Sequence, residues 1–448
     1  MYSKKFNLII KSKISPFRKI IKVDSDKSIS IRSFLLGSIC NNISSVKNVL
    51  ESEDVLSTIE CLSKLGVKIK KQKSKNYLIY GKGLGSLRAK KNTKLNFGNS
   101  GTLARLLIGI LSTTPKIELK ISGDRSLNKR SMKKLIKLMN EFGTFFIPEN
   151  KFNFPLKIIS SDMPVGIHYK AGVSAQLKSA VILAGLNSYG NTKISQSVLS
   201  RDHTEKMLLA NNQLIKIDKK FNLINIFGKK GQLKPINITV PGDPSSAAFF
   251  VALTLLNKNS TIKIKNVCLN PTRIGFYKLL KIHGANIKFK NLRKVNNEIN
   301  GDIHVQSCFI KPIKANKKYY VNSTDEYPIL FIIAALTKGV SSFKGIGDLA
   351  NKESNRIVEM QKVLKQIGVR SFFSKNELKI FGLGMINAIN KKIEVPNLGD
   401  HRICMSSFIL SILTGAKTKI KNFDTVFTSS PSFLKIMKSF GVKFEEQK

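Results

Sequence analysis

The chain has 448 residues, 42% of them hydrophobic, and is long enough to bury the cores of two or three domains. Its longest apolar stretch, Pro328 to Leu336, is too short to span a membrane, and its first residues lack the apolar core of a signal peptide. We therefore expect a cytoplasmic protein with no membrane partner. The five cysteines are scattered without a C-x-x-C pair, which predicts buried, reduced thiols and no metal site.

The charge balance is strongly basic, with 76 Lys and Arg residues against 28 Asp and Glu, a formal net charge of +48. A nucleic-acid partner is one interpretation of this excess. The lysines, however, are spread along the whole chain without a basic tail. We therefore favour a solvated cationic surface that attracts small polyanionic substrates, and we expect no nucleic-acid partner.

Helix ends recur along the chain at intervals of about 75 residues, which is typical of a repeated unit. Helix-like segments end at Gly66, Gly143, Gly284, Gly368 and Gly441, each before a β-rich stretch. Glycine at this position suits the left-handed cap of a helix. A sixth copy is predicted at 207–212, where Asn212 replaces the glycine.

Helix starts recur in phase with these ends. Six short polar residues each precede an apolar helix-like segment, namely Ser28, Ser100, Ser174, Asp243, Asp325 and Asp400. With short β-patterned runs between the helices, this predicts an α/β or α+β fold of six units, and the change from Ser to Asp suggests two domains of three units. Helix N-termini attract anions, so the Ser-opened set suits an anionic ligand and the Asp-opened set can supply carboxylates.

Three motifs in the first half combine such helix starts with cations. Asp26 to Arg32 places Lys27, Ser28 and Arg32 around one helix start, which indicates an anion clamp. The glycines of 98–105 let the backbone approach a ligand, and 123–130 adds further guanidinium groups. Each motif alone is a weak signal for phosphate binding.

Ten motifs in order make the pattern specific. They are D-K-S-x-S-x-R, G-N-S-G-T-x-x-R, G-D-x-S-L-x-x-R, S-A-Q-x-K-S-A, S-R-D-H-T-E-K-M-L, P-G-D-P-S-S-A-A-F, N-P-T-R, D-E-Y-P, K-E-S-x-R and G-D-H-R. From about Lys22 to Phe433 the chain resembles the 5-enolpyruvylshikimate-3-phosphate synthase family. The residues of its motifs resemble the class II bacterial form more than the enteric or plant form.

The resemblance implies an enolpyruvyl transferase fold of six β-α-β-α-β-β units in two domains. Residues 1–22 and 240–448 would form one domain and residues 23–239 the other, with the active site in the cleft between them. It also implies a transferase that moves the enolpyruvyl group of phosphoenolpyruvate to the 5-hydroxyl of shikimate 3-phosphate and releases phosphate, on the shikimate pathway to chorismate and aromatic amino acids. We expect a monomer that uses no metal and no organic cofactor.

The resemblance also implies residue roles wherever the motifs match. Asp325 would take the proton of the 5-hydroxyl and Glu353 would protonate the donor's methylene carbon, with Lys27 as the rival for proton transfer. Shikimate 3-phosphate would be bound by Lys27, Ser28, Arg32, Ser174, Ala175, Gln176, Arg201, Asp325 and Lys352. Phosphoenolpyruvate would be bound by Lys27, Asn99, Gly101, Arg130, Gln176, Arg356 and Arg402.

Several residues depart from the family's pattern. Asp24-Ser25 stands where Pro-Gly is usual, Ile31 replaces a frequent His, Ser131 a Pro and Asn355 a frequent Asp, and 428–431 lacks a lysine of the enteric form. None of these removes a charged residue named above. Of the two histidines inside motifs, we expect His203 to make a structural hydrogen bond, whereas His401 either does the same or lies close to phosphoenolpyruvate.

Two alternatives remain open. UDP-N-acetylglucosamine enolpyruvyl transferase would share the fold and the donor, but no cysteine of this chain lies in a Gly-rich loop comparable to its reactive one. A nucleic-acid protein of the same repeat, such as RNA 3′-phosphate cyclase, would suit the charge. Such a binding module would not need Asp325 and Glu353 inside these motifs.

Overall fold

The computed structural model describes residues 5–448, which form two compact units. Unit 1 contains the described residues up to Asp24 together with Pro241–Val295 and Ile299–Lys448. Unit 2 contains Ser25–Val240 and the short stretch Asn296–Glu298. That the boundaries expected at residues 22 and 240 separate two domains with an active site between them stays a prediction.

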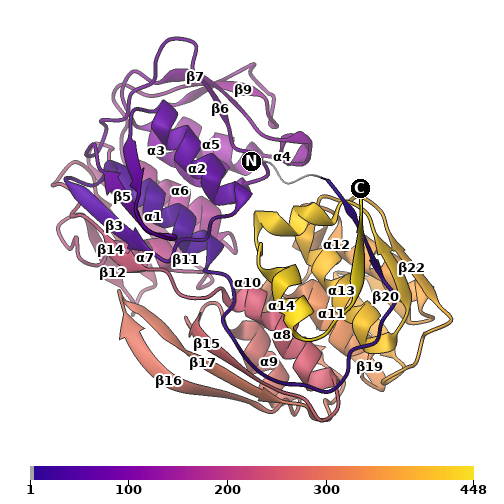
Figure 1. Cartoon of the computed structure of the whole chain (residues 1–448). Coiled ribbons are helices and arrows are strands. Elements are labelled where there is room, and N and C mark those ends of the chain that lie inside the picture. The colour runs from indigo at the N-terminus through magenta and orange to yellow at the C-terminus, as the bar shows by residue number, and fades with distance from the viewer. Residues whose placement is uncertain (1–4) are drawn as a thin grey trace. The chain divides into compact units, whose positions relative to one another are not determined.

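Each unit is built from three four-stranded sheets of one design (Figure 1). In every sheet the first two strands pair in parallel and the second pairs antiparallel with the third. The sheets of unit 2, in spatial order, are β14 (Asn237–Thr239), β3 (Ile43–Lys47), β5 (Tyr77–Tyr80) and β4 (Lys68–Lys71); β6 (Lys94–Asn96), β7 (Glu118–Ser122), β9 (Leu156–Ile159) and β8 (Phe145–Ile147); and β10 (His168–Ala171), β11 (Asn191–Gln196), β13 (Leu223–Phe227) and β12 (Ile215–Asp218).

The sheets of unit 1 repeat the design with strands that are more distant in sequence. In spatial order they are β2 (Arg18–Ile21), β15 (Thr261–Cys268), β17 (Glu298–Gln306) and β16 (Ile287–Val295); β18 (Lys314–Ala315), β19 (Gly339–Lys344), β21 (Glu377–Gly382) and β20 (Arg370–Ser374); and β22 (Lys392–Val395), β23 (Lys417–Ile420), β1 (Asn7–Ile10) and β24 (Phe444–Gln447). The indigo N-terminal strand β1 therefore lies between two yellow C-terminal strands (Figure 1). β2 belongs to unit 1 although α1 (Lys27–Ile39) of unit 2 follows it, and β14 belongs to unit 2 although α8 (Pro244–Leu256) of unit 1 follows it.

Two helices accompany each sheet, an inner one and an outer one. The inner helices are α1 (Lys27–Ile39), α3 (Gly101–Ser112), α6 (Ala175–Gly185), α8 (Pro244–Leu256), α11 (Tyr327–Ala335) and α13 (His401–Thr414). The outer helices are α2 (Glu53–Lys64), α5 (Lys133–Glu141), α7 (His203–Leu208), α9 (Gly275–Ile282), α12 (Arg356–Gln366) and α14 (Phe433–Ser439). Short helices complete the chain at α4 (Arg125–Lys129), α10 (Tyr320–Ser323), η1 (Lys317–Tyr319), η2 (Gly347–Asn351) and η3 (Phe423–Thr428).

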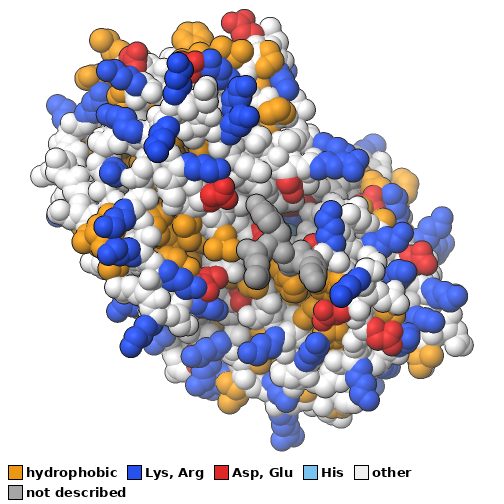
Figure 2. Space-filling model, turned by 45° about the horizontal axis from the view of Figure 1, so that its top comes forward, with side chains coloured by type: hydrophobic (Ala, Val, Ile, Leu, Met, Phe, Trp, Pro, Cys, Tyr) orange, Lys and Arg blue, Asp and Glu red, His pale blue; other side chains and the backbone are white. Residues whose placement is uncertain are grey.

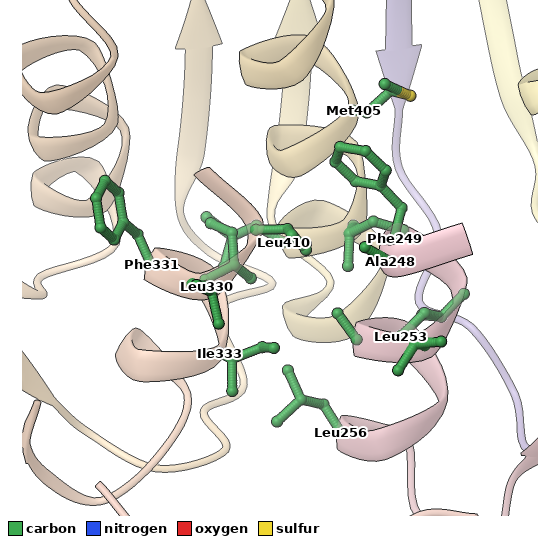
Figure 3. Packing of buried hydrophobic residues seen from close by; sticks show 14 of the residues in the cluster. Ala248, Phe249, Leu253, Leu256, Leu330, Phe331, Ile333, Met405 and Leu410 are labelled. Atoms are coloured by element: carbon green, nitrogen blue, oxygen red, sulfur yellow. The ribbon is translucent and has the colours of Figure 1, made fainter. Parts of the chain in front are cut away.

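The inner helices form the core of each unit because almost all of their residues are buried. Every residue of α8, α11 and α13 is buried, and the three helices pack against one another in unit 1. Figure 3 shows side chains of this core from all three helices, among them Phe249 of α8, Leu330 of α11 and Leu410 of α13. In unit 2, α3 packs against both α6 and α1. The polar groups that these helices leave accessible lie at their N-termini.

Most of the predicted helix ends and helix starts are confirmed. The five glycines have the left-handed backbone, with φ between 82° and 96°. Asn212 is a wrong prediction, because it is not among the residues with positive φ: α7 ends at Leu208 and a turn follows. Two predicted caps also shift. Asp26 rather than Ser28 caps α1 by accepting from the Ile29 N–H, and α11 begins after Glu326 rather than Asp325.

Most of the cysteines are buried, as the sequence predicted. All five cysteines are free, four of them buried, whereas Cys308 is only half-buried. Burial raises the pKa of the Cys40 thiol to about 12, so it stays protonated at neutral pH.

On the face shown in Figure 2, Lys and Arg side chains are dispersed rather than gathered into one patch. No helix within residues 5–448 is both long and apolar enough to cross a bilayer.

Candidate active site

The inner helices of unit 2 are buried except at a few positions within their first five residues. The partly accessible positions are Lys27 and Ser28 of α1, Arg105 of α3, and Ala175 and Gln176 of α6. Four of these five positions are residues that the motifs predicted to bind substrate. Helix N-termini present free N–H groups and a positive dipole end, so this arrangement favours anions.

Side-chain contacts join the starts of α3 and α6. The Arg105 guanidinium donates to Gln176 Oε1 at 2.9 Å, and Gln176 Nε2 donates to Thr102 Oγ1 at 3.0 Å. Ser100 and Ser174 cap these two helices by accepting from backbone N–H groups three residues on. The two predicted binding segments are therefore held together by Arg105 and Thr102, neither of which was predicted to join them.

Lys27 and Arg32 have anchors that sequence reasoning missed. Lys27 Nζ lies 2.9 Å from the buried carboxylate of Asp54, in the first turn of α2. Arg32 Nε donates to Thr204 Oγ1 at 2.9 Å, and its Nη2 donates to Ser179 Oγ at 3.2 Å. No motif could have signalled Asp54, because its stretch of sequence matches none of the ten.

Arg130 lies beside the Gly-rich loop. Its Nη2 donates to Asn99 Oδ1 and, at 3.2 Å, to Ser126 Oγ, while Asn99 Nδ2 donates to Asp124 Oδ2 at 2.9 Å. A Cβ atom at Gly101 would lie 2.6 Å from Arg105 Nη1 and 3.3 Å from Arg130 Nη1. Two guanidinium groups thus face the backbone at Gly101, where a side chain would displace them.

In unit 1, Arg356 is surrounded by carboxylates. Its Nε donates to Asp400 Oδ2 at 2.9 Å and its Nη2 to Glu353 Oε2 at 2.7 Å, and Asp325 Oδ1 lies 3.8 Å from Nη1. The guanidinium is almost fully buried. Burial works against its charge, but Asp400 and Glu353 outweigh that effect and raise the pKa of Arg356. Both predicted proton-transfer carboxylates are therefore held by one permanently charged group.

Arg402 lies in the first turn of α13. Its backbone N–H donates to Asp400 Oδ1 at 2.9 Å, and its guanidinium lies over the ring of Phe249 at 5.8 Å. The side chain is buried, yet Nε and Nη1 have no hydrogen-bond partner among residues 5–448. Buried donors without partners are costly, so these atoms indicate a place for an anionic ligand.

The remaining predicted residues have these positions. Lys352 Nζ lies 2.7 Å from Asp348 Oδ2, which also accepts from the Tyr320 hydroxyl. Arg201 lies half-buried on the irregular segment before α7. His203 Nδ1 lies 2.6 Å from Glu298 Oε1, which confirms the structural hydrogen bond expected of it, whereas His401 is buried at the start of α13.

Two departures from the family's pattern have structural partners. Asn355 Oδ1 accepts from the Val358 N–H at 3.2 Å and so caps α12, as an aspartate would. Asp24 is buried, and its Oδ2 accepts from Ser430 Oγ at 3.1 Å and from the Ser432 N–H at 2.9 Å. Nothing in the structure explains Ser131 in place of proline.

Asp400 is expected to be the residue of this cluster on which stability depends most. It is fully buried, caps α13 and accepts from both Arg356 and Ser354. Asp400→Ala removes a carboxylate that balances the positive charge of the buried Arg356. We therefore expect a loss of about 3–5 kcal/mol in the free energy of unfolding. Urea unfolding measures it. Glu359→Ala, which removes only an ion pair with an exposed lysine of α12, is the control, and equal losses in the two variants would contradict the prediction.

No His, Cys, Asp and Glu side chains in the described part of the chain form a group that could hold a metal ion. The expectation that the protein uses no cofactor stays a prediction.

Comparisons with known proteins agree with the motifs. The family model described as EPSP synthase (3-phosphoshikimate 1-carboxyvinyltransferase) matches residues 11–437. A 3-phosphoshikimate 1-carboxyvinyltransferase of Zymomonas mobilis is 36% identical over 442 residues, 98% of this chain and 97% of that protein. One of Vesicomyosocius okutanii is 38% identical over 423 residues, 94% of this chain and 95% of that protein.

Solved structures give the same result. The EPSP synthase of Acinetobacter baumannii superposes with a TM-score of 0.84 at 33% identity, covering 99% of this chain and 100% of that one. The enolpyruvyl transferase NikO of Streptomyces tendae has a TM-score of 0.76 at 11% identity, covering 99% of each chain, and shows the fold alone. The predicted enolpyruvyl transferase fold is thereby confirmed, and the chain belongs to the EPSP synthase family.

Proposed function

We propose that this protein transfers the enolpyruvyl group of phosphoenolpyruvate to the 5-hydroxyl of shikimate 3-phosphate, releasing inorganic phosphate. Family membership over nearly the whole chain supports this reaction. The acceptor hydroxyl forms a bond to C2 of the donor, and the bond from C2 to the phosphate oxygen breaks. The product is an enol ether on the pathway to chorismate and aromatic amino acids.

The reaction requires a proton donor and a proton acceptor among cations. C2 of phosphoenolpyruvate becomes electrophilic when its methylene carbon is protonated, and the hydroxyl then adds to C2 and gives up its proton. Phosphate leaves as the new methyl group loses a proton, which restores the carbon–carbon double bond. We assign the methylene proton to Glu353 and the hydroxyl proton to Asp325, both next to Arg356. Lys27, paired with Asp54, is the second candidate for proton transfer.

Shikimate 3-phosphate is an anion with a hydroxylated ring, and the helix starts of unit 2 suit it. Backbone N–H groups, hydroxyls and guanidiniums are the usual donors for phosphate. The proposed set is Lys27, Ser28, Arg32, Ser174, Ala175, Gln176 and Arg201 from unit 2, with Asp325 and Lys352 from unit 1.

Phosphoenolpyruvate carries a carboxylate and a phosphate, which planar guanidiniums bind through paired hydrogen bonds. In a desolvated site such fixed charges also stabilise the charge that develops during transfer. The proposed set is Lys27, Asn99, Gly101, Arg130 and Gln176 from unit 2, with Arg356 and Arg402 from unit 1.

The observation that carries the proposal is the guanidinium of Arg402. It is a buried cation whose Nε and Nη1 make no hydrogen bond with the described part of the chain. Asp400 connects its backbone to Arg356, which holds both proposed proton-transfer carboxylates. A site that needs an anion beside an acid and a base fits the donor substrate.

The test is an assay of phosphate release from phosphoenolpyruvate with shikimate 3-phosphate, with UDP-N-acetylglucosamine, and with no acceptor. We expect phosphate to be released only in the reaction that contains both phosphoenolpyruvate and shikimate 3-phosphate. Release with the nucleotide sugar instead would identify the alternative enolpyruvyl transferase. Retention of labelled RNA on a filter, with no release in any reaction, would favour a nucleic-acid protein of this fold.

Gly101→Ala is expected to raise the KM for phosphoenolpyruvate by about tenfold, because displaced guanidiniums lose part of a charge-assisted hydrogen bond. The new Cβ would lie 2.6 Å from Arg105 Nη1, which must move, and 3.3 Å from Arg130 Nη1, which must give by a few tenths of an ångström. Steady-state kinetics with each substrate varied in turn measures the change. Gly172→Ala, at an open position of unit 2, is the matched control, and an unchanged KM in Gly101→Ala would remove the loop from the donor site.

We also propose that the protein works as a cytoplasmic monomer without a nucleic-acid or membrane partner. Sedimentation of the purified protein and fractionation of the source cells test these points.

A further inference from the structure

A lysine buried inside unit 2 has no part in the function proposed above. Lys178 lies on α6, two residues after Gln176, and its side chain is fully buried. Its ammonium lies 2.6 Å from Glu205 Oε1 and donates to Gln196 Oε1 at 2.9 Å and to the Ser200 carbonyl at 3.2 Å. Three oxygens thus match the three protons of the ammonium group.

Stability alone does not account for this ion pair. Lysine is almost never fully buried, and taking two charges out of water offsets most of their attraction. Apolar residues of similar volume in place of such a pair are often neutral or stabilising. A buried pair is therefore better explained where it holds a particular conformation, and the partners of Lys178 show which one.

Two of these partners lie at the two ends of one short segment. Ser200 directly precedes Arg201, and Glu205 directly follows Thr204. Residues 199–202 belong to no helix or strand, so no ladder of backbone hydrogen bonds determines where Arg201 lies. One ammonium group on α6 holds both ends of this segment.

The segment also orients a second cation. Thr204 Oγ1 accepts from Arg32 Nε at 2.9 Å and donates to Ser179 Oγ at 2.8 Å, and Ser179 Oγ accepts from Arg32 Nη2. Ser179 is the next residue after Lys178 on α6. Movement of the segment would therefore displace Thr204 from Arg32 as well as Arg201 itself.

We propose that Lys178 is a positioning residue for the phosphate group of shikimate 3-phosphate, acting through its hold on Ser200 and Glu205. It contacts no substrate. It sets the places of Arg201 and Arg32, which bind the phosphate, and so contributes to the preference for the phosphorylated acceptor. This inference rests on the proposed function.

The first test is Lys178→Met, with Kd measured by calorimetry for shikimate 3-phosphate and for shikimate, which lacks the phosphate. We expect the Kd of shikimate 3-phosphate to rise about 10- to 100-fold, the order expected when a charge-assisted hydrogen bond is lost, and that of shikimate to change less than about threefold. Equal losses for the two ligands would overturn the proposal.

A second variant separates positioning from stability, because Lys178→Met alone leaves Glu205 buried without its cation. Lys178→Met with Glu205→Met removes both charges and is expected to unfold closer to wild type in urea. Its Kd for shikimate 3-phosphate should stay raised about 10-fold or more, since the hold on Ser200 is still absent. A double variant that binds as tightly as wild type would overturn the proposal.

The control is Thr144→Val, which removes a buried hydrogen bond to the Ser112 carbonyl elsewhere in unit 2 and should leave both Kd values unchanged. Weakened binding of shikimate 3-phosphate in this control would show that any loss of stability has the same effect, and would overturn the proposal. Failure of the wild-type protein to bind shikimate 3-phosphate at all would overturn the proposed function and this inference together. A wild-type protein that binds and converts it, beside an unaffected double variant, would overturn this inference alone.

Discussion

Glu353→Gln and Asp325→Asn are each expected to lower kcat by about 10²–10⁴-fold, the usual contribution of a positioned acid or base. The amides keep the size of the side chains and a carbonyl oxygen that faces Arg356, so the fold is retained, but they cannot transfer the proton. Steady-state turnover with both substrates saturating measures the effect, and circular dichroism checks the fold.

The matched control is Glu359→Gln on the same helix as Arg356. Glu359 pairs with Lys362 at 2.8 Å and has no proposed role, so its amide variant should keep wild-type turnover. Near-normal kcat in both Glu353→Gln and Asp325→Asn would contradict the assignment of acid and base. A loss in only one would leave Lys27 as the second group.

Arg402→Met is expected to raise the KM for phosphoenolpyruvate by about 10²-fold and that for shikimate 3-phosphate by less than about threefold, since a hydrogen bond to a charged group contributes roughly 1.5–3 kcal/mol. Methionine keeps an apolar stem of similar length and removes the guanidinium, including the two donors that have no partner among the described residues. Arg130→Ala should change the same constant in the same direction. Kinetics with each substrate varied separately measures the difference.

Arg370→Ala is the control for Arg402. Arg370 lies on β20 of the same unit, with its guanidinium over the Phe381 ring, and has no proposed role. Its loss should leave both KM values unchanged. If Arg402→Met weakened shikimate 3-phosphate instead of phosphoenolpyruvate, the two sets of binding residues would have to be exchanged.

The repeated unit could be predicted because its signals are local. A glycine with positive φ after an outer helix and a polar residue before an inner one are readable within a few positions, as Gly66 and Ser100 show. The choice between two capping residues that lie two positions apart could not be made from the sequence. Asp26 and Ser28 are both good caps, and only the backbone at residue 26 decides for Asp26.

The pairing of strands that are distant in sequence could not be predicted from the periodicity of hydrophobic residues. β1 pairs with β23 and β24 across nearly the whole chain, and β2 and β14 each join a sheet of the unit that does not contain the helix following them. Nothing in the residues 7–10 or 237–239 indicates these partners. The expected assignment of the first strand to the second half came from the family resemblance.

In the candidate site, too, local signals could be predicted from the sequence and contacts between distant residues could not. Motifs identified the groups that substrates would contact, such as Arg356. Of the groups that hold them, Asp54 lies outside every motif, and Asp400 and Thr204 lie inside motifs that do not indicate which arginine each one contacts. Lys178 and Glu205 were visible inside two motifs, yet their pairing depends on complete burial, which no short pattern reveals. Supporting residues are therefore where the structure adds most to the sequence.

The most direct test of enolpyruvyl transfer is the reaction of the purified protein with phosphoenolpyruvate and shikimate 3-phosphate in D₂O, followed by mass spectrometry. The predicted result is one enolpyruvyl ether and one phosphate for each shikimate 3-phosphate consumed, with deuterium in the product's methylene group, because the methylene carbon is protonated from solvent-exchangeable groups and then loses a proton. An unconsumed acceptor, or an ether formed without any deuterium in the methylene group, would contradict the account.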